Sequence, residues 1–246
     1  SYRIFASDRD NITFDYLGND QNFIGCDNKY ITNKLSLFDK NIAGKYDIPN
    51  PHGGGTAYMN AVDKNGLGVS LIQSNFYGIG SRIGVGSYGF FLHNRGCGFN
   101  LIKGHPNSLG PNKKPLHTLS PTIWSKAGSL DFITGTRGGR YQPQLLAQTI
   151  LPYILGENSF EEIMKKPRWK IEYFGPNTPS AIKFEFIEKS HMNSLINKGH
   201  KISVENKLIG GNGPISTIYK NSDEKFVGVP DIRVGTEKAF NNSWFL

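Results

Sequence analysis

The sequence predicts an α+β fold in which two β-sheets are sandwiched between helices, a four-layer αββα sandwich. Residues 57–62 and 68–74 alternate in polarity on either side of a turn, which is typical of a β-hairpin. A predicted strand over 130–134 ends near paired glycines and is followed by an amphipathic helix. Predicted strands over 215–219 and 226–229 form a second hairpin near the end of the chain. Groups of strands and helices that alternate in this way favour sheets covered by helices.

The region before the first hairpin, residues 1–51, is expected to begin with the end of a helix and then to lack regular structure. Its sequence is rich in Asn, Asp and Lys and shows little hydrophobic periodicity. Pro49-Asn50-Pro51 indicates an extended linker, which continues through His52-Gly53-Gly54-Gly55 to Thr56. We expect this linker to be an exposed, mobile loop.

After the hairpin, five glycines between residues 78 and 89 indicate a glycine-rich turn, and residues 88–92 are predicted to form a short strand. The segment 101–118 contains three prolines and is expected to be irregular. The helix after strand 130–134 is predicted to present one apolar face, made of Leu145, Leu146, Ile150 and Leu151.

A capping box formed by Ser159 and Glu162 predicts the start of the next helix, which stops at Pro167. Residues 183–187 alternate in polarity and are predicted to form a strand. The following helix is expected to end at Gly199 and to carry an apolar stripe of Met192, Leu195 and Ile196. We assign these elements to the core, without a ligand.

Composition restricts the class of protein. The 246 residues can bury one sizeable core, and 37% hydrophobic and 12% aromatic residues indicate a globular chain. No run of about 18 apolar residues predicts a membrane span. The net charge of +8 comes from scattered basic residues, which favours a solvated surface over a nucleic-acid interface.

No metal or other cofactor is predicted. Metal-ligand spacing is missing among the histidines considered, which are His52, His93, His105, His191 and His200. Cys26 and Cys97 belong to no CxxC pair. Whether the two cysteines form a disulfide is left open, and we expect both to be free, buried thiols.

Thr56 is the candidate nucleophile because it follows three glycines at the start of a predicted strand. A threonine hydroxyl is a weak nucleophile unless a base assists it, and the α-amino group of the same residue can be that base. This chemistry requires cleavage of the Gly55–Thr56 bond. The alternative is that Thr56 is an ordinary loop residue.

A second candidate feature is the junction after strand 130–134, where Gly138-Gly139 precede a helix. Paired glycines at a helix N-terminus present unobstructed backbone N–H groups to an anion. In acyl transfer that anion is the tetrahedral oxyanion. The alternative is a tight strand-to-helix turn that binds nothing.

Several motifs resemble the γ-glutamyltransferase (glutathione hydrolase) family of self-cleaving N-terminal-nucleophile hydrolases. The first is Gly-Thr-x-Tyr-x-x-x-Val-Asp-x-x-Gly-x-x-Val-Ser-Leu-x-Gln-Ser, which spans residues 55–74. Others follow in the family's order, at Gly78-Ile79-Gly80-Ser81, Leu92-His93-Asn94-Arg95-Gly96, Gly104-His105-Pro106-Asn107, residues 114–122, Gly138-Gly139 and Asp231-Ile232-Arg233. The resemblance covers essentially the whole chain.

The resemblance implies that residues 1–55 are the tail of a large subunit with the cleavage linker, and that residues 56–246 are the small-subunit catalytic domain. The family's αββα fold takes elements from both subunits, so we expect this chain to be incomplete without an upstream large-subunit portion as its partner. A homo-oligomer is possible in such a family. The compartment, whether cytoplasmic, periplasmic or secreted, is left open.

The resemblance also implies roles for site residues. Ser74 matches a second hydroxyl residue that hydrogen-bonds the nucleophile, and Gly138 and Gly139 match the oxyanion-hole glycines. His117 and Thr118 match two serines that bind the substrate's α-carboxylate. A satisfied structural histidine is an equal alternative for His117.

Three positions depart from the family pattern. Phe76 replaces an asparagine that helps to hold the substrate, so an apolar wall is expected there. Arg95 and Gly98 replace the residues that bind the substrate's α-amino group. Because an arginine repels an ammonium and can pair with a carboxylate, we expect a free α-amino group to be recognised differently or not at all.

The expected function is hydrolysis or transfer of a γ-glutamyl or related acyl group from an amide such as glutathione, through an acyl-threonine intermediate. The departures at Phe76, Arg95 and Gly98 motivate a rival, an amidase with another acyl specificity that is similar to cephalosporin acylases. A rival of another class is an unprocessed, inactive remnant that acts as an interaction protein.

Overall fold

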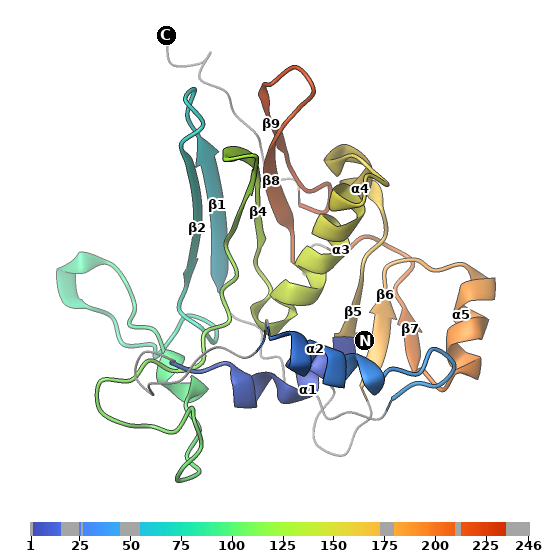
Figure 1. Ribbon diagram of the computed structural model, residues 1–246. Coiled ribbons are helices and arrows are strands. Elements are labelled where there is room, and N and C mark those ends of the chain that lie inside the picture. The colour runs from blue at the N-terminus through green and yellow to red at the C-terminus, as the bar shows by residue number, and fades with distance from the viewer. Residues whose placement is uncertain are drawn as a thin grey trace.

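The computed structural model describes residues 2–15, 25, 27–44, 55–172, 180–209 and 213–234 (Figure 1). Two helices precede the first hairpin, and strands and helices then alternate. In chain order the regular elements are α1 (Tyr2–Ile12), α2 (Asn28–Ser36), β1 (Thr56–Val62), β2 (Gly68–Ser74), β3 (Thr122–Lys126), β4 (Ser129–Thr136), α3 (Gln142–Ile154), α4 (Phe160–Lys165), β5 (Trp169–Glu172), β6 (Ala181–Phe184), α5 (Lys189–Asn197), β7 (Ile202–Val204), β8 (Ile215–Lys220) and β9 (Phe226–Val229). Short 3₁₀ turns are η1 (Gly86–Tyr88), η2 (Arg95–Gly98) and η3 (Gly139–Tyr141).

The hairpin β1–β2 lies against the four-stranded antiparallel sheet β3-β4-β8-β9 (Figure 1). Close approach of the two layers requires glycine at two positions. A Cβ on Gly135 in β4 would lie 2.2 Å from the ring of Tyr58 in β1, and a Cβ on Gly68 in β2 would lie 2.5 Å from the Ile133 side chain. The Asn60 carboxamide also donates to the Ser216 carbonyl over 3.2 Å, which joins the two layers directly.

The other face of the four-stranded sheet is covered by α3 and α4 (Figure 1). Phe132 of β4 lies at the centre of this core, stacked on Trp124 and in contact with Tyr153 and Phe160. The predicted capping box is present, because Ser159 and Glu162 each accept a backbone hydrogen bond from the other. The described residues therefore form three successive layers, the hairpin, the sheet and the helices, and the α+β class is confirmed.

A separate three-stranded sheet, β5-β6-β7, lies beside α3 and carries α5 on its far side (Figure 1). Strands β5 and β6 are antiparallel, whereas β6 and β7 are parallel because α5 forms the crossover between them. The sequence reasoning predicted β6 at 183–187, but it spans Ala181–Phe184. The strand ends at Phe184 because Phe184 pairs with Trp169, the first residue of its antiparallel partner β5. Glu185 beyond it is fully buried, and its carboxylate accepts hydrogen bonds from Arg233.

Three further expectations are wrong. Residues 88–92 form no strand, because φ is positive at Gly86 and Gly89 and the chain turns through η1. Helix α2 lies in a segment that was expected to lack regular structure, and its start is capped by the Asp27 carboxylate, which accepts from the Tyr30 N–H. The side chain of Leu151 is 55% exposed, so the buried stripe of α3 is narrower than predicted.

Cys97 is free, as expected, but it is exposed rather than buried. Cys26 and most of the predicted linker, residues 45–54, lie outside the described residues. Within the described part of the chain, no helix is long and apolar enough to cross a membrane.

Candidate active site

Thr56 and Ser74 face each other across the open end of the hairpin, as register partners at the first residue of β1 and the last residue of β2. The Thr56 Oγ1 donates a hydrogen bond to Ser74 Oγ over 2.9 Å. The Phe76 N–H donates to the same Ser74 oxygen over 3.1 Å. Thr56 is only 9% exposed, so its hydroxyl is held in a defined position within the protein.

Gly55, on the N-terminal side of the predicted cleavage bond, is held by one backbone contact. Its N–H donates to the Gly78 carbonyl over 3.1 Å. A Cβ at residue 55 would lie 2.9 Å from that same carbonyl oxygen, which is closer than real Cβ atoms approach. Glycine at position 55 is therefore required by the close approach of the two segments.

A small cavity of about 10 Å³ adjoins the Thr56 hydroxyl, which is room for about one water molecule. It is lined by Thr56, Ser74, Phe76, Tyr77, Thr118, Gly139 and Arg140. Five of these residues were candidates from the sequence. They lie in β1, in β2 and just after it, in the loop before β3 and in η3. Tyr77 and Arg140 were not predicted, although each is the chain neighbour of a predicted residue.

The strand-to-helix junction after β4 forms a turn that only glycine adopts readily. Gly138 has φ of +132° and Gly139 has φ of +55°. Gly139 lines the cavity beside Thr56, whereas Gly138 packs beneath it against Leu145 and Gly213. The paired glycines predicted from the sequence are thus on the same side of the fold as the Thr56 hydroxyl.

Phe76 forms one wall of the cavity in a conformation that is rare for a side-chain-bearing residue. It has φ of +77° and is 6% exposed. The guanidinium carbon of Arg95 lies 4.9 Å from the centre of the Phe76 ring, within the range of a cation–π contact. The backbone strain at Phe76 is a feature found more often at ligand sites than elsewhere.

Arg95 is 7% exposed, and its Nη1 and Nη2 atoms are buried without a hydrogen-bond partner among the described residues. Burial lowers the pKa of this guanidinium below its ordinary value. Arg95 also affects His117, whose pKa is lowered first by partial burial and then by the positive charge of Arg95. His117 is accordingly a neutral imidazole at pH 7.

Gly98 brings the Arg95 turn close to the segment that carries His117 and Thr118. A Cβ on Gly98 would lie 3.1 Å from the Leu116 carbonyl oxygen. The Asn107 side chain joins the two segments, since it donates to the Gly98 carbonyl over 2.6 Å and accepts from the Leu116 N–H over 3.1 Å. The glycine that departs from the family pattern therefore has a packing role.

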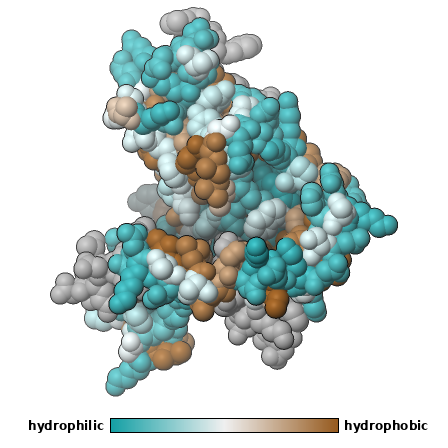
Figure 2. Space-filling view, turned by 45° about the vertical axis from the view of Figure 1, so that its right-hand side comes forward, coloured by the Kyte–Doolittle hydropathy of each residue, from teal (hydrophilic) through white to brown (hydrophobic). Residues whose placement is uncertain are grey.

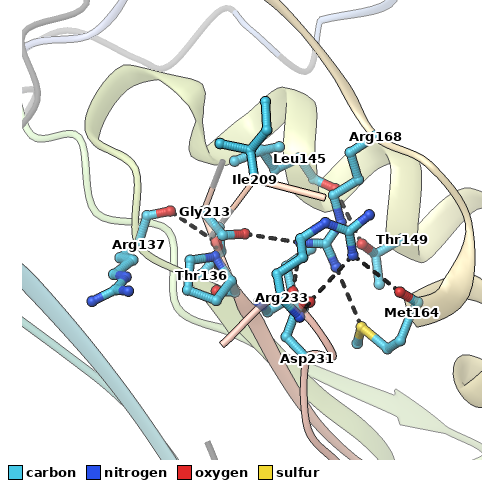
Figure 3. Close-up of polar contacts among 12 residues, drawn as sticks. Thr136, Arg137, Leu145, Thr149, Met164, Arg168, Ile209, Gly213, Asp231 and Arg233 are labelled. Atoms are coloured by element: carbon cyan, nitrogen blue, oxygen red, sulfur yellow. Dashed lines mark hydrogen bonds and ion pairs between the residues drawn. The ribbon is translucent and has the colours of Figure 1, made fainter. Parts of the chain in front are cut away.

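Arg168, Asp231 and Arg233 form a buried ionic cluster beside Gly213 (Figure 3). Arg168 donates to the Asp231 carboxylate over 2.6 Å and to the Gly213 carbonyl over 3.1 Å. Asp231 also accepts from the Ile215 N–H over 2.8 Å. Because Gly213 packs against Gly138, this cluster supports the turn from below.

The same cluster includes a second ion pair, between Arg233 and Glu185. Burial acts to raise the pKa of each carboxylate, but hydrogen bonds and the neighbouring guanidinium groups outweigh it and hold the pKa values of Glu185 and Asp231 below their ordinary values. In the sequence, Asp231-Ile232-Arg233 stands out only as a motif, and nothing marks Arg168 and Glu185 as its partners. Isolated charged residues in a sequence give no signal that they are buried together.

Among the described residues, no group of three or more His, Cys, Asp or Glu side chains is arranged to hold a metal ion. The site therefore consists of a buried hydroxyl pair, a glycine turn, a strained aromatic wall and a buried arginine. A hydroxyl that shares a cavity with a glycine of a strand-to-helix turn suits attack on a carbonyl carbon.

Known proteins that this chain is similar to include a glutathione hydrolase-like proenzyme and an amidohydrolase proenzyme. The chain is 37% identical over 119 residues to the glutathione hydrolase-like YwrD proenzyme of Bacillus subtilis, and the aligned region covers 48% of the chain and 23% of that protein. It is 30% identical over 189 residues to the oxamate amidohydrolase proenzyme of Klebsiella pneumoniae, and that aligned region covers 74% of the chain and 36% of the relative. The chain thus spans about a quarter to a third of the length of these relatives.

Solved structures show the same fold. The superposition on the cephalosporin acylase of Bacillus halodurans covers 83% of this chain and 37% of the acylase chain, with a TM-score of 0.67 and 26% identity. The superposition on the γ-glutamyltranspeptidase of Pseudomonas nitroreducens covers 75% of this chain and 99% of that chain, with a TM-score of 0.61 and 19% identity.

The model of the γ-glutamyltranspeptidase family matches residues 19–240, which is most of the chain. With the motifs in family order and the αββα-type fold, this match leads to one conclusion. The chain belongs to the γ-glutamyltranspeptidase family.

Proposed function

We propose that this chain carries the nucleophile of a self-processing enzyme that hydrolyses or transfers a γ-glutamyl or related acyl group from an amide. In this proposal residues 1–55 are the end of the large subunit with the cleavage linker, and residues 56–246 are the small-subunit catalytic domain. The proposal rests on the position of the Thr56 hydroxyl. It is hydrogen-bonded to the Ser74 hydroxyl over 2.9 Å, and Thr56 lines the same cavity as Gly139.

Processing is the first step of the proposed mechanism. Thr56 Oγ attacks the Gly55 carbonyl carbon, the C–N bond between Gly55 and Thr56 breaks, and an ester to Thr56 Oγ forms. The Thr56 nitrogen takes up the hydroxyl proton and becomes a free α-amino group as that bond breaks. Water then hydrolyses the ester, which releases the Gly55 carboxylate and restores the Thr56 hydroxyl. One residue now carries both nucleophile and base.

In the catalytic cycle the Thr56 α-amino group takes the hydroxyl proton as Oγ attacks the amide carbonyl of the substrate. Backbone N–H groups of Gly138 and Gly139 stabilise the oxyanion. The intermediate expels the amine, which receives the proton, and leaves an acyl ester on Thr56. Water or a second amine then attacks this ester, releases the acyl group and restores the hydroxyl.

The remaining candidate residues act on the substrate. Ser74 orients the Thr56 hydroxyl through the hydrogen bond that joins them. Thr118 lines the cavity and supplies a hydroxyl donor, and Phe76 closes one side of it. Arg95 packs against Phe76, with its guanidinium carbon 4.9 Å from the centre of the ring, and the exposed His117 precedes Thr118 in the chain.

A second candidate function is an amidase with a different acyl group. It is favoured by Arg95 and Gly98, which offer no acceptor for an α-ammonium, and by the similarity to the oxamate amidohydrolase and the cephalosporin acylase. Hydrolysis of γ-glutamyl and glutaryl p-nitroanilides, measured side by side on the full-length protein, separates the two candidates.

The decisive experiment is intact-mass analysis of the full-length protein. The proposal requires a chain that begins at Thr56 in the active preparation, and Thr56→Ala should remain uncleaved and inactive. Active protein with an unbroken Gly55–Thr56 bond contradicts the proposed mechanism. Correctly folded full-length protein that is neither cleaved nor active would favour the remnant hypothesis.

A further inference from the structure

We propose that Arg95 forms an anion subsite behind the Phe76 wall that binds a carboxylate on the acyl group of the substrate. The preferred acyl group would carry this carboxylate and lack an α-ammonium, as in a monoamide of a simple dicarboxylic acid. The inference rests on the proposed function, because it names the substrate class of the same site.

The first argument is the missing partner of a buried cation. Arg95 is 7% exposed, and neither Nη atom has a hydrogen-bond partner among the described residues. A buried charged group without a partner is costly, and proteins nearly always pair it. The two Nη atoms form a fork that matches the two oxygens of a carboxylate.

The second argument is how the fold holds Arg95 in place. The neighbouring Asn94 side chain accepts from the Tyr77 N–H over 2.9 Å and donates to the carbonyls of Tyr77 and Gly80 over 3.2 and 3.0 Å. Tyr77 itself lines the cavity beside Thr56. Two of these hydrogen bonds therefore tie the residue before Arg95 to the cavity wall at Tyr77, and the third ties it to Gly80.

The charges around the cavity are positive. Among the described residues that line it there is no acidic side chain, and Arg140 is the one cation. Partial burial and then the charge of Arg95 lower the pKa of His117, which favours its neutral form. Gly98 offers no side chain that could accept from an ammonium. The site is thus complementary to an acyl group of net negative charge.

The approach of a carboxylate requires movement of Phe76, because the Nη atoms are buried in the present conformation. Phe76 has φ of +77°, so its backbone stores strain that a different conformation can release. The cation–π contact between Phe76 and Arg95 is then replaced by a charge-assisted pair between Arg95 and the substrate. This pair is the stronger of the two interactions.

The test compares three p-nitroanilides on the processed full-length protein. The glutaryl compound carries a carboxylate alone, the γ-glutamyl compound carries a carboxylate and an α-ammonium, and the pentanoyl compound carries neither. We expect kcat/KM to be highest for the glutaryl compound. In Arg95→Gln the ratio of glutaryl to pentanoyl kcat/KM should fall about ten- to a hundredfold, mainly through KM.

Two variants serve as controls. Arg82→Gln removes an exposed arginine from the same glycine-rich region and should leave the ratio unchanged. Arg95→Lys keeps the charge and loses the fork, so it should recover part of the ratio. Calorimetric binding of glutarate to the wild type and to both Gln variants provides a readout that does not need turnover.

The outcomes separate the two proposals. Equal glutarate binding by wild type and Arg95→Gln, or equal cleavage of glutaryl and pentanoyl compounds, overturns the subsite and leaves the Thr56 mechanism in place. A wild-type preference for the γ-glutamyl compound over the glutaryl one overturns the claim about the ammonium. If no amide is cleaved but glutarate binding still depends on Arg95, the proposed function fails and the subsite stands.

Discussion

The hydroxyl of Thr56 donates to the hydroxyl of Ser74 over 2.9 Å, across the mouth of a hairpin whose register pairs the two residues. Neighbouring strands present directly opposed side chains on the same face, so this contact follows from the pairing itself. The register extends without a shift from this pair to Val62 and Gly68 at the turn. The position of the proposed nucleophile is therefore set by the whole hairpin.

We expect Ser74→Ala to slow both processing and turnover by about ten- to a hundredfold, because the Thr56 hydroxyl loses its hydrogen-bond acceptor. Ser74→Thr keeps the hydroxyl and should retain most of the activity. The rate of precursor cleavage and kcat for anilide hydrolysis measure the effect. Wild-type rates in Ser74→Ala would remove Ser74 from the proposed mechanism.

We expect Gly139→Ala to lower kcat by about a hundredfold, since φ of +55° disfavours a Cβ and the turn must shift its backbone N–H groups. Gly128→Ala is a matched control. Gly128 lies in the β3–β4 turn with φ of +81° and open space around its Cβ position. The Gly128→Ala variant should lower the free energy of unfolding about as much as Gly139→Ala, by roughly 1–2 kcal/mol, with little change in kcat. Equal loss of kcat in both variants would argue against an oxyanion role.

We expect Gly135→Ala to lower the free energy of unfolding by about 1–3 kcal/mol, because the new Cβ would overlap the Tyr58 ring and push the hairpin away from β4. Urea denaturation of the full-length protein measures this change. Gly84→Ala is the control, since its Cβ would meet only one ring atom, at 3.9 Å. A similar stability of the two variants would mean that the two layers tolerate a wider separation.

We expect acid to destabilise the protein through the ionic cluster. The pKa values of Glu185 and Asp231 lie below their ordinary values of 4.5 and 3.8, so their ionised forms stabilise the folded state above those pH values. This contribution is lost as the pH falls through the lowered folded-state pKa values. Urea midpoints of the full-length protein should therefore change little from pH 7 to 5 and drop below about pH 4.

The Arg233→Met variant checks the origin of that drop, because it leaves the Glu185 carboxylate buried without its cation. It should cost about 3–5 kcal/mol at pH 7 and show a smaller further loss in acid. Arg233→Lys keeps a cation beside Glu185 and should retain most of the acid drop. An acid drop in Arg233→Met as steep as that of the wild type would place its cause elsewhere.

Much of the local structure was predictable from short stretches of sequence. The alternation around Asp63-Lys64-Asn65-Gly66 predicted β1 and β2, and the Asp63 carboxylate indeed accepts from the N–H groups of Asn65 and Leu67. The Ser159–Glu162 box predicted the start of α4. These features depend on residues within a few positions of one another, so their physics is contained in the sequence itself.

The sequence by itself determined the hairpin, the glycine turn and the chemistry available to Thr56. Only the tertiary structure decided that Thr56, Thr118 and Gly139 line one cavity and that Arg168 and Asp231 are buried together. It also decided that the Nη atoms of Arg95 have no hydrogen-bond partner among the described residues. The reason is that backbone conformation depends mainly on near neighbours, whereas burial and charge pairing depend on segments brought together from far along the chain.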